Sequence, residues 1–150
     1  MKTMLEKFSK KDITATNVLI FITVVMYIIQ INIEEGGLLF GLNLYFLVYN
    51  FWWQPLSTIF AHGGIAHLGI NMFVLWQFGN LIERSRSSKE LIALYLVTGI
   101  ITSLLSFAYI YYLVSSVILV VASWSLCALL CYVAYYDKAL FIVLITLVLL

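Results

Sequence analysis

Five apolar stretches run along this chain, and short polar or charged segments separate them. The first four cover residues 17–33, 64–82, 91–112 and 113–136, and a fifth covers residues 138–150. A helix of roughly 20 apolar residues crosses a hydrocarbon core about 30 Å thick. The pattern therefore predicts four complete membrane-spanning helices and part of a fifth.

Residues 38–59, between the first two predicted spans, are apolar without forming one continuous run. Glycines, amide side chains and the only proline of the chain interrupt this segment, and tyrosine and tryptophan recur along it. Aromatic residues of these two types favour the boundary between lipid and water. We therefore expect an interfacial or re-entrant segment here rather than a span.

Composition agrees with a membrane protein. Aliphatic, aromatic and sulfur-containing residues make up 64% of the chain and charged residues only 10%, and the mean hydropathy is +1.07. A soluble domain of this length is far less apolar. Because backbone polar groups in lipid must be satisfied internally, the spans are expected to be helices. The predicted fold class is an all-α polytopic membrane protein, folded as a helical bundle.

The positions of the charged residues predict the orientation. All eight lysines and arginines lie in the first 11 residues, in a charged turn at residues 83–90, or at residue 138. The segments after the first and third spans have none, so the amino terminus is expected to be cytoplasmic.

The first span lacks a cleavage pattern of small residues, so we do not expect a removed signal peptide. The net charge of +1 forms no basic face for nucleic acid.

The fifth apolar run, residues 138–150, is too short to cross a membrane. It would rise only about 18 Å as a helix, against a core about 30 Å thick. Its terminal carboxylate would then lie in hydrocarbon, where a charge is costly. We therefore expect the sequence to be a fragment, with one membrane domain over residues 1–150 that is incomplete at its carboxyl end.

Both histidines of the chain and an asparagine lie in or beside the second span. His67 and Asn71 are four residues apart and therefore project from one face of a helix. Counted from the cytoplasmic ends of their spans, Asn71 lies about 18 Å deep, His67 about 24 Å and Ser123 about 21 Å. His62 belongs to the turn before the span, so we expect it at the rim of the same site. The count places these polar groups in one layer.

A serine, a histidine and an asparagine at one depth suit acyl transfer. The serine hydroxyl attacks a carbonyl carbon, and amide or imidazole N–H groups stabilise the oxyanion that forms. A third histidine that could act as the general base is missing from the sequence. One alternative for Ser123 is a hydroxyl that bonds its own helix. Another is a metal transporter that uses His62 and His67, although these have no carboxylate or thiolate neighbours.

Cys127 and Cys131 follow Ser123 at intervals of four residues. Because both cysteines lie inside one apolar span, neither a disulfide framework nor a thiolate metal site is predicted. Small side chains at this spacing allow another helix to approach closely. We therefore expect this stripe to pack against a neighbouring helix.

Motifs in and around the second span carry a resemblance to a known family. A His-x4-His-x3-Asn-Met element, a Trp-Gln pair upstream and a Gly-x3-Glu-Arg ending are similar to those of the rhomboid family of intramembrane serine proteases. The resemblance extends over the whole chain and implies a rhomboid-like helical bundle. The matching residues are His62, His67, Asn71, Met72, Trp53, Gln54, Gly79, Glu83 and Arg84.

The fourth span contains a second point of resemblance. The family's nucleophile lies in a Gly-x-Ser-Gly motif, and residues 121–124 read Val-Ala-Ser-Trp at that position. The resemblance implies Ser123 as the nucleophile, His67 and Asn71 as oxyanion-binding residues, and His62 as a pocket-lining residue. The family's general base lies in an Ala-His-x-x-Gly motif of a sixth helix, and these 150 residues do not contain that motif.

The resemblance implies a serine-type endopeptidase of a bacterial inner membrane. It would cleave transmembrane or membrane-proximal segments of other membrane proteins within the bilayer, without a cofactor or metal ion. Four residues depart from the family pattern: Val121 and Trp124 replace glycines, Gln54 replaces arginine, and Cys127 replaces an aromatic residue. The two replaced glycines and the missing general-base histidine suit an alternative function, a rhomboid-like protein that binds client membrane helices without cleaving them.

Overall fold

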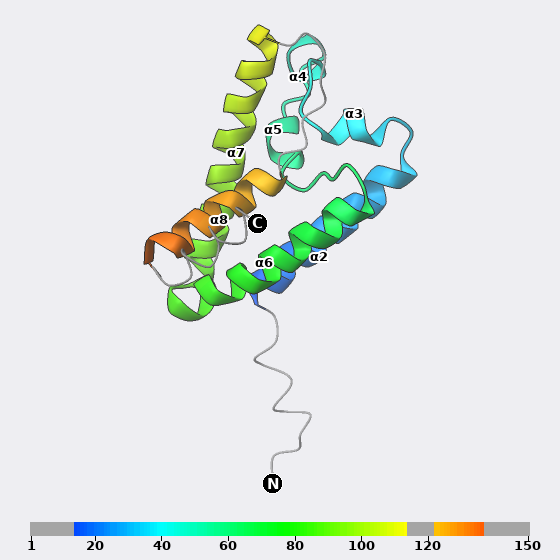
Figure 1. Cartoon of the computed structure of the whole chain (residues 1–150). Helices are drawn as coiled ribbons and strands as arrows, with labels where there is room; N and C mark the ends of the chain where they lie inside the picture. Colours follow the sequence, from blue (N-terminus) through cyan, green and yellow to red (C-terminus); the bar gives the residue numbers. More distant parts are fainter. Residues whose placement is uncertain (1–13, 114–121, 137–150) are drawn as a thin grey trace.

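The computed structural model describes residues 14–113 and 122–136, and every regular element within those ranges is a helix (Figure 1). Four helices are long, and three helices of one turn lie between the first two of them. The long helices are α2 (Ala15–Asn32), α6 (Ile65–Ser85), α7 (Ser88–Leu113) and α8 (Ala122–Tyr136). The short ones are α3 (Gly36–Phe40), α4 (Tyr45–Val48) and α5 (Gln54–Ser57).

Three of the long helices have the length and the apolar composition to cross a membrane: Ala15–Asn32, Ile65–Ser85 and Ser88–Tyr109. They coincide with the first three predicted spans and confirm the helical membrane fold. The short helices α3, α4 and α5 contain only four or five residues each, which confirms that this segment does not span. The first part of the fourth predicted span and the whole fifth run lie outside the described residues.

The turn between α6 and α7 is shorter than the sequence predicted. α6 continues through Glu83 to Ser85, and α7 begins at Ser88. The hydroxyl of Ser87 accepts a hydrogen bond from the backbone N–H of Glu90 at 3.1 Å, which is half of a Ser-x-x-Glu capping box. The predicted charged turn over residues 83–90 is therefore confined to residues 86–87, because charged side chains at a helix end do not stop the helix.

Glu83 joins the start of α2 to the end of α6. Its carboxylate accepts hydrogen bonds from the backbone N–H groups of Ala15 and Thr16, each at 2.8 Å, and from the hydroxyl of Thr16. The hydroxyl of Ser88 donates to the same carboxylate at 2.6 Å. The first N–H groups of a helix have no partner within it. In α2, a side chain from another helix satisfies two of them.

Gly79 allows α2 and α6 to lie close together. A Cβ atom at position 79 would be 2.8 Å from Oγ1 and 2.9 Å from Cγ2 of Thr16. We expect Gly79→Ala to lower the free energy of unfolding by about 1–3 kcal/mol through overpacking. Gly69→Ala on the same helix is the control, because the added Cβ would have no described atom of another segment within 4 Å. Equal stability of the two variants in mixed-micelle unfolding would contradict the close approach.

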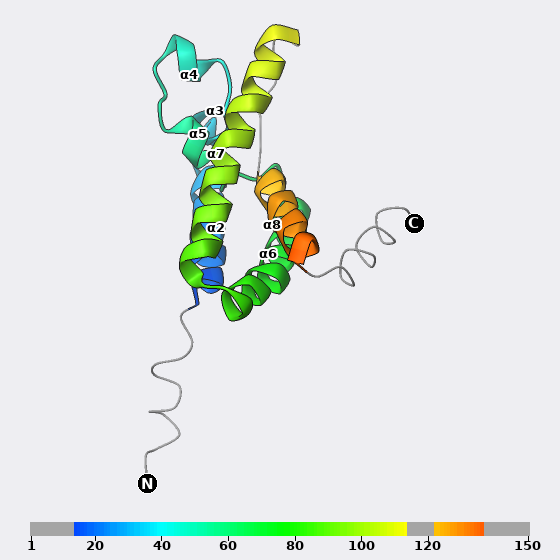
Figure 2. The same cartoon turned by 90° about the vertical axis from the view of Figure 1, so that its left-hand side faces the viewer.

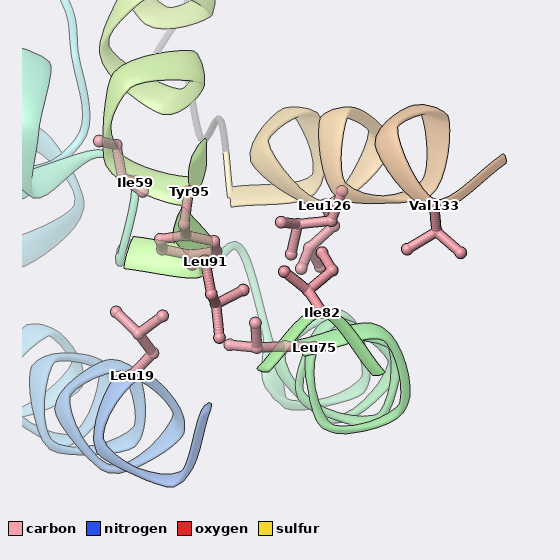
Figure 3. Close-up of a cluster of buried hydrophobic side chains, with 9 residues drawn as sticks. Leu19, Ile59, Leu75, Ile82, Leu91, Tyr95, Leu126 and Val133 are labelled. Carbon is pink, nitrogen blue, oxygen red and sulfur yellow. The ribbon is translucent and has the colours of Figure 1, made fainter. Parts of the chain in front are cut away.

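Buried apolar side chains join the long helices into one bundle (Figure 3). The side chains come from helices α2, α6, α7 and α8 and from the segment that follows α5. Its members are Leu19, Ile59, Leu75, Ile82, Leu91, Tyr95, Leu126, Leu129 and Val133. The outward faces of the long helices are apolar as well, with Phe21, Phe73 and Leu105 all largely exposed. Such a surface suits lipid rather than water.

α8 packs against α6 and α7. The contact uses Leu126, Leu129 and Val133, which lie on one helix face by their spacing of three and four. Cys127 and Cys131 are exposed. The prediction that the cysteines pack against a neighbouring helix is therefore wrong for the described part of the chain, because the larger leucine and valine side chains bury more apolar area.

Candidate functional site

The two histidines and Asn71 form one hydrogen-bonded cluster. The side-chain Nδ2 of Asn71 lies 3.1 Å from Nε2 of His62 and 3.1 Å from Nε2 of His67. The two imidazole rings are 5.2 Å apart between centroids. Asn71 and His67 come from α6, and His62 comes from the segment that joins α5 to α6. We call these three residues the His–Asn–His cluster.

The pattern of α6 explains why Asn71 faces inward. The buried residues of this helix repeat every three or four positions, which forms one stripe toward the core. Asn71 lies on this stripe and is only 4% exposed, and His67 lies one turn earlier and is half-buried. The expectation that these two share a face is confirmed by their hydrogen bond. The stripe consists of Leu68, Asn71, Leu75, Gly79 and Ile82.

His62 lies in the interior and not at the rim that the sequence predicted. Its side chain is 1% exposed, and its ring Nδ1 is 3.0 Å from the carbonyl oxygen of Phe60. The ring of Tyr27 in α2 lies nearly perpendicular to the imidazole, at an interplanar angle of 89° and with centroids 6.5 Å apart. The rim prediction is wrong because hydrogen bonds and packing hold the segment before α6 against α2.

The contacts of His62 determine its protonation. A carbonyl oxygen only accepts hydrogen bonds, so Nδ1 of His62 carries a proton that it donates to Phe60. Burial lowers the pKa of His62; the bond to Phe60 opposes this shift, and the nearby His67 adds to it. The neutral ring therefore presents Nε2 as an acceptor, and Asn71 donates to it. The second N–H of Asn71 is directed at Nε2 of His67.

The neutral state of His62 predicts a pH dependence of stability. Because its pKa is lower in the folded protein than the ordinary value of 6.5, the unfolded chain binds a proton more readily as the pH falls. We expect the free energy of unfolding to fall as the pH drops below about 6.5. Unfolding in mixed micelles at several pH values measures it, and His62→Gln should lose this part of the dependence. An identical pH dependence in both proteins would contradict the neutral, buried imidazole.

The cluster can supply hydrogen-bond donors to a developing negative charge. Asn71 holds two N–H groups, and in this structure they are directed at the Nε2 atoms of the two imidazoles. A hydrogen bond to an anion is roughly twice as strong as one between neutral groups. An oxyanion formed beside Asn71 would therefore compete well for one of these N–H groups. The surrounding burial makes such a donor more effective than it would be in water.

Ser123 belongs to the first turn of α8. In both Figures 1 and 2, the amino-terminal end of α8 lies beside the segment between α5 and α6, which contains His62. α8 also packs against α6, the helix that carries Asn71. The side chain of Ser123 is outside the described part of the structure, so its place relative to the cluster stays a prediction.

Gln54, which departs from the family pattern, is fully buried and bonded. Its Nε2 donates to the carbonyl oxygen of Leu38 at 2.8 Å, and its Oε1 accepts from the backbone N–H of Asn43 at 3.3 Å. The indole N–H of Trp53 donates to the carbonyl of Leu39 at 3.0 Å. Gln54 therefore joins α3 and the chain just after it to α5, next to the segment that carries His62.

Sequence reasoning did not assign a role to Gln30. The side chain of this α2 residue bonds the backbone of His62, and its one signal was an amide within an apolar span.

Metal binding has little support from the geometry, because the Nε2 atoms of His62 and His67 both face Asn71. Within residues 14–113 and 122–136, no group of three or more histidine, cysteine or acidic side chains is placed to hold a metal ion.

Comparison with known proteins gives consistent matches. Residues 49–149 match the family described as "Rhomboid domain". "Rhomboid protease GluP" of Bacillus subtilis (strain 168) is 41% identical over 58 residues, which cover 39% of this chain and 11% of that protein. "Rhomboid protease AarA" of Providencia stuartii is 30% identical over 118 residues, which cover 73% of this chain and 42% of that protein.

A human relative matches a shorter part of this chain than the two bacterial proteins do. "Presenilin-associated rhomboid-like protein, mitochondrial" of Homo sapiens is 33% identical over 52 residues, which cover 35% of this chain and 14% of that protein. The chain thus spans less than half the length of each of these relatives. No solved structure matches the chain significantly.

Proposed function

This chain belongs to the rhomboid family, and we propose that it is an intramembrane serine endopeptidase that cleaves transmembrane or membrane-proximal segments of other membrane proteins. The observation that carries the proposal is the His–Asn–His cluster, buried inside a helical membrane protein with one amide donating to two imidazoles. A polar cluster of this kind is costly inside a membrane and usually marks a functional site.

We assign the nucleophile to Ser123, oxyanion binding to His67 and Asn71, and the lining of the pocket to His62. The reaction needs no cofactor or metal ion. The general base is not assigned, because both histidines of this sequence already belong to the cluster. The relatives named rhomboid proteases support the proposed activity, since "Rhomboid protease AarA" is similar over most of the chain.

The proposed chemistry is acyl transfer through an ester. The Ser123 oxygen adds to the carbonyl carbon of a peptide bond while its proton passes to the base. An N–H of Asn71, released from an imidazole, donates to the oxyanion. The C–N bond then breaks, and the amine leaves with the proton from the base. Water then adds to the ester carbonyl while its proton passes to the base. The C–O bond to Ser123 breaks, the acid leaves, and the base returns the proton to the Ser123 oxygen.

We propose one rhomboid-like domain over residues 1–150, with four complete spans, part of a fifth, and an interfacial segment after the first span. The three helices that can cross a membrane support this arrangement. The exposed aromatic side chains of the segment, Tyr49 and Trp52 among them, suit the interface. The charge pattern supports a cytoplasmic amino terminus, and we propose a bacterial inner membrane as the location.

A second candidate function is binding of client membrane helices without cleavage. The observation that favours it is the pair Val121 and Trp124 beside Ser123, where the family motif has glycines. Side chains at these positions restrict how closely the backbone of a substrate approaches the serine. Recognition of a helix by the lipid-facing surface does not need such an approach.

A cleavage assay separates the two functions. The protein, expressed from its complete reading frame, is reconstituted in liposomes with fluorescent transmembrane substrates, and an active rhomboid protease serves as the positive control. We expect cleavage products from both proteins. Intact substrates that co-purify with the folded protein would reject the protease and support the binder.

A further inference from the structure

The side chain of Gln30 forms hydrogen bonds with both the backbone N–H and the backbone carbonyl of His62. Its Nε2 donates to the carbonyl oxygen of His62 at 2.8 Å, and its Oε1 accepts from the backbone N–H of His62 at 3.1 Å. Gln30 lies near the end of α2, whereas His62 is 32 positions later in the chain. One side chain thus satisfies both backbone polar groups of a single residue in another segment.

Further hydrogen bonds connect His62 to Asn71. With its backbone held, the His62 ring donates from Nδ1 to the carbonyl of Phe60 at 3.0 Å. Its Nε2 then faces Nδ2 of Asn71 at 3.1 Å. The contacts run without a gap from Gln30 to the carboxamide that we assign to oxyanion binding.

The backbone of Gln30 is held in place as well. A Cβ atom at position 36 would lie only 2.1 Å from the carbonyl oxygen of Gln30. The chain after α2 therefore turns back against this carbonyl, and only glycine at Gly36 leaves room for it. Tyr27, one turn earlier on α2, packs against the His62 ring in a T-shaped arrangement. α2 thus fixes His62 at its backbone and at its ring.

We propose that Gln30 is a positioning residue for the His–Asn–His cluster. It fixes the backbone of His62, which selects the Nδ1-protonated ring and thereby orients the N–H groups of Asn71. The role of this orientation in catalysis rests on the proposed protease function. The orientation itself does not, because it follows from contacts within the folded chain.

The test measures the tautomer of His62 directly. Protein with ¹⁵N-labelled imidazoles is reconstituted in bilayers after removal of the purification tag, and its nitrogen resonances are recorded. The His62 signals are assigned by their loss in His62→Gln. Gln30→Met keeps the length of the side chain and removes both hydrogen bonds. Asn32→Leu is the matched control, because the side chain of Asn32 donates to a carbonyl of its own helix, that of Ile28, at 2.8 Å and not to His62.

We expect the wild-type protein and Asn32→Leu to show His62 as one Nδ1-protonated form. Gln30→Met should lose this single form and show a mixture with the Nε2-protonated tautomer. The same single form in folded Gln30→Met would overturn the proposal. If Gln30→Met does not fold, Gln30→Glu gives the same readout, since a carboxylate accepts from the His62 N–H but cannot donate to its carbonyl.

Catalysis adds an independent readout that is separate from the tautomer. If the protein cleaves substrates, Gln30→Met should lower kcat by about tenfold to a hundredfold, with little change in KM, because the donors are misplaced and substrate binding is not. A lost tautomer with unchanged kcat would overturn the positioning role. If the wild-type protein lacks protease activity and Gln30→Met still changes the tautomer of His62, the proposed function is rejected. The positioning of His62 by Gln30 is then still supported.

Discussion

Alanine in place of Asn71 is expected to slow cleavage of a membrane substrate by about 10²- to 10³-fold. Asn71 donates both hydrogen bonds that join the members of the His–Asn–His cluster, and its side chain is only 4% exposed. The variant loses the donor that would stabilise the oxyanion. It also leaves the Nε2 atoms of His62 and His67 without this partner. The loss should fall on kcat, because the donor acts in the transition state.

Asn80→Ala is the matched control for this prediction. Asn80 lies on the same helix, and its Nδ2 donates to the carbonyl of Trp76 at 2.6 Å within that helix. Its replacement should leave kcat within about twofold of the wild-type value, since a substitution away from the site has little effect. Equal rates for Asn71→Ala and Asn80→Ala in liposomes would remove Asn71 from the reaction.

Alanine in place of Glu83 is expected to lower the free energy of unfolding by about 2–3 kcal/mol. The carboxylate accepts from two backbone N–H groups of α2 and from the hydroxyls of Thr16 and Ser88. Its removal leaves the backbone N–H groups of Ala15 and Thr16 without this acceptor and removes a hydrogen-bonded link between α2 and α6. Bonds to a charged acceptor exceed ordinary ones, and partial exposure of Glu83 limits the total. Equilibrium unfolding in mixed micelles measures the change.

Two variants bracket the effect of Glu83. Glu83→Gln retains an acceptor oxygen without the charge and should lie between the wild type and Glu83→Ala. Glu34→Ala removes an exposed carboxylate just after α2 and should change the free energy of unfolding by less than about 0.5 kcal/mol. A loss for Glu83→Ala no larger than that for Glu34→Ala would mean that the carboxylate does not join the two helices.

The sequence predicted the parts of the fold that depend on local pattern. Apolar run length located α2, α6 and α7, because a membrane helix satisfies its own backbone and needs only length and apolarity. Helical spacing also predicted that His67 and Asn71 share a face, and their hydrogen bond confirms it. These features involve residues close together in the sequence.

Contacts between distant segments were not predictable in the same way. The burial of His62 depends on Gln30, 32 residues earlier, and the start of α2 depends on Glu83, 67 residues later. No periodicity relates such positions. The inward face of α8 was assigned to the cysteines on the basis of small size, whereas larger apolar residues bury more area and occupy that face.

The residues that flank Ser123 gave opposing indications. The motif of residues 121–124 resembles that of a nucleophile, yet Trp124 replaces a glycine. Gln54 departs from the family in a similar way, but it is buried and bonds two backbone segments. A departure from a family pattern therefore has to be judged from the contacts that the new residue makes.

Labelling of Ser123 by a serine-reactive fluorophosphonate tests the central claim most directly. The protein from its complete reading frame is treated in bilayers, with Ser123→Ala as the test variant and Ser125→Ala as the matched control in the same helix. We expect labelling of the wild type and of Ser125→Ala, and none of Ser123→Ala. A folded protein that stays unlabelled beside a labelled active rhomboid protease, or labelling that survives Ser123→Ala, would contradict the assignment of Ser123 as the nucleophile.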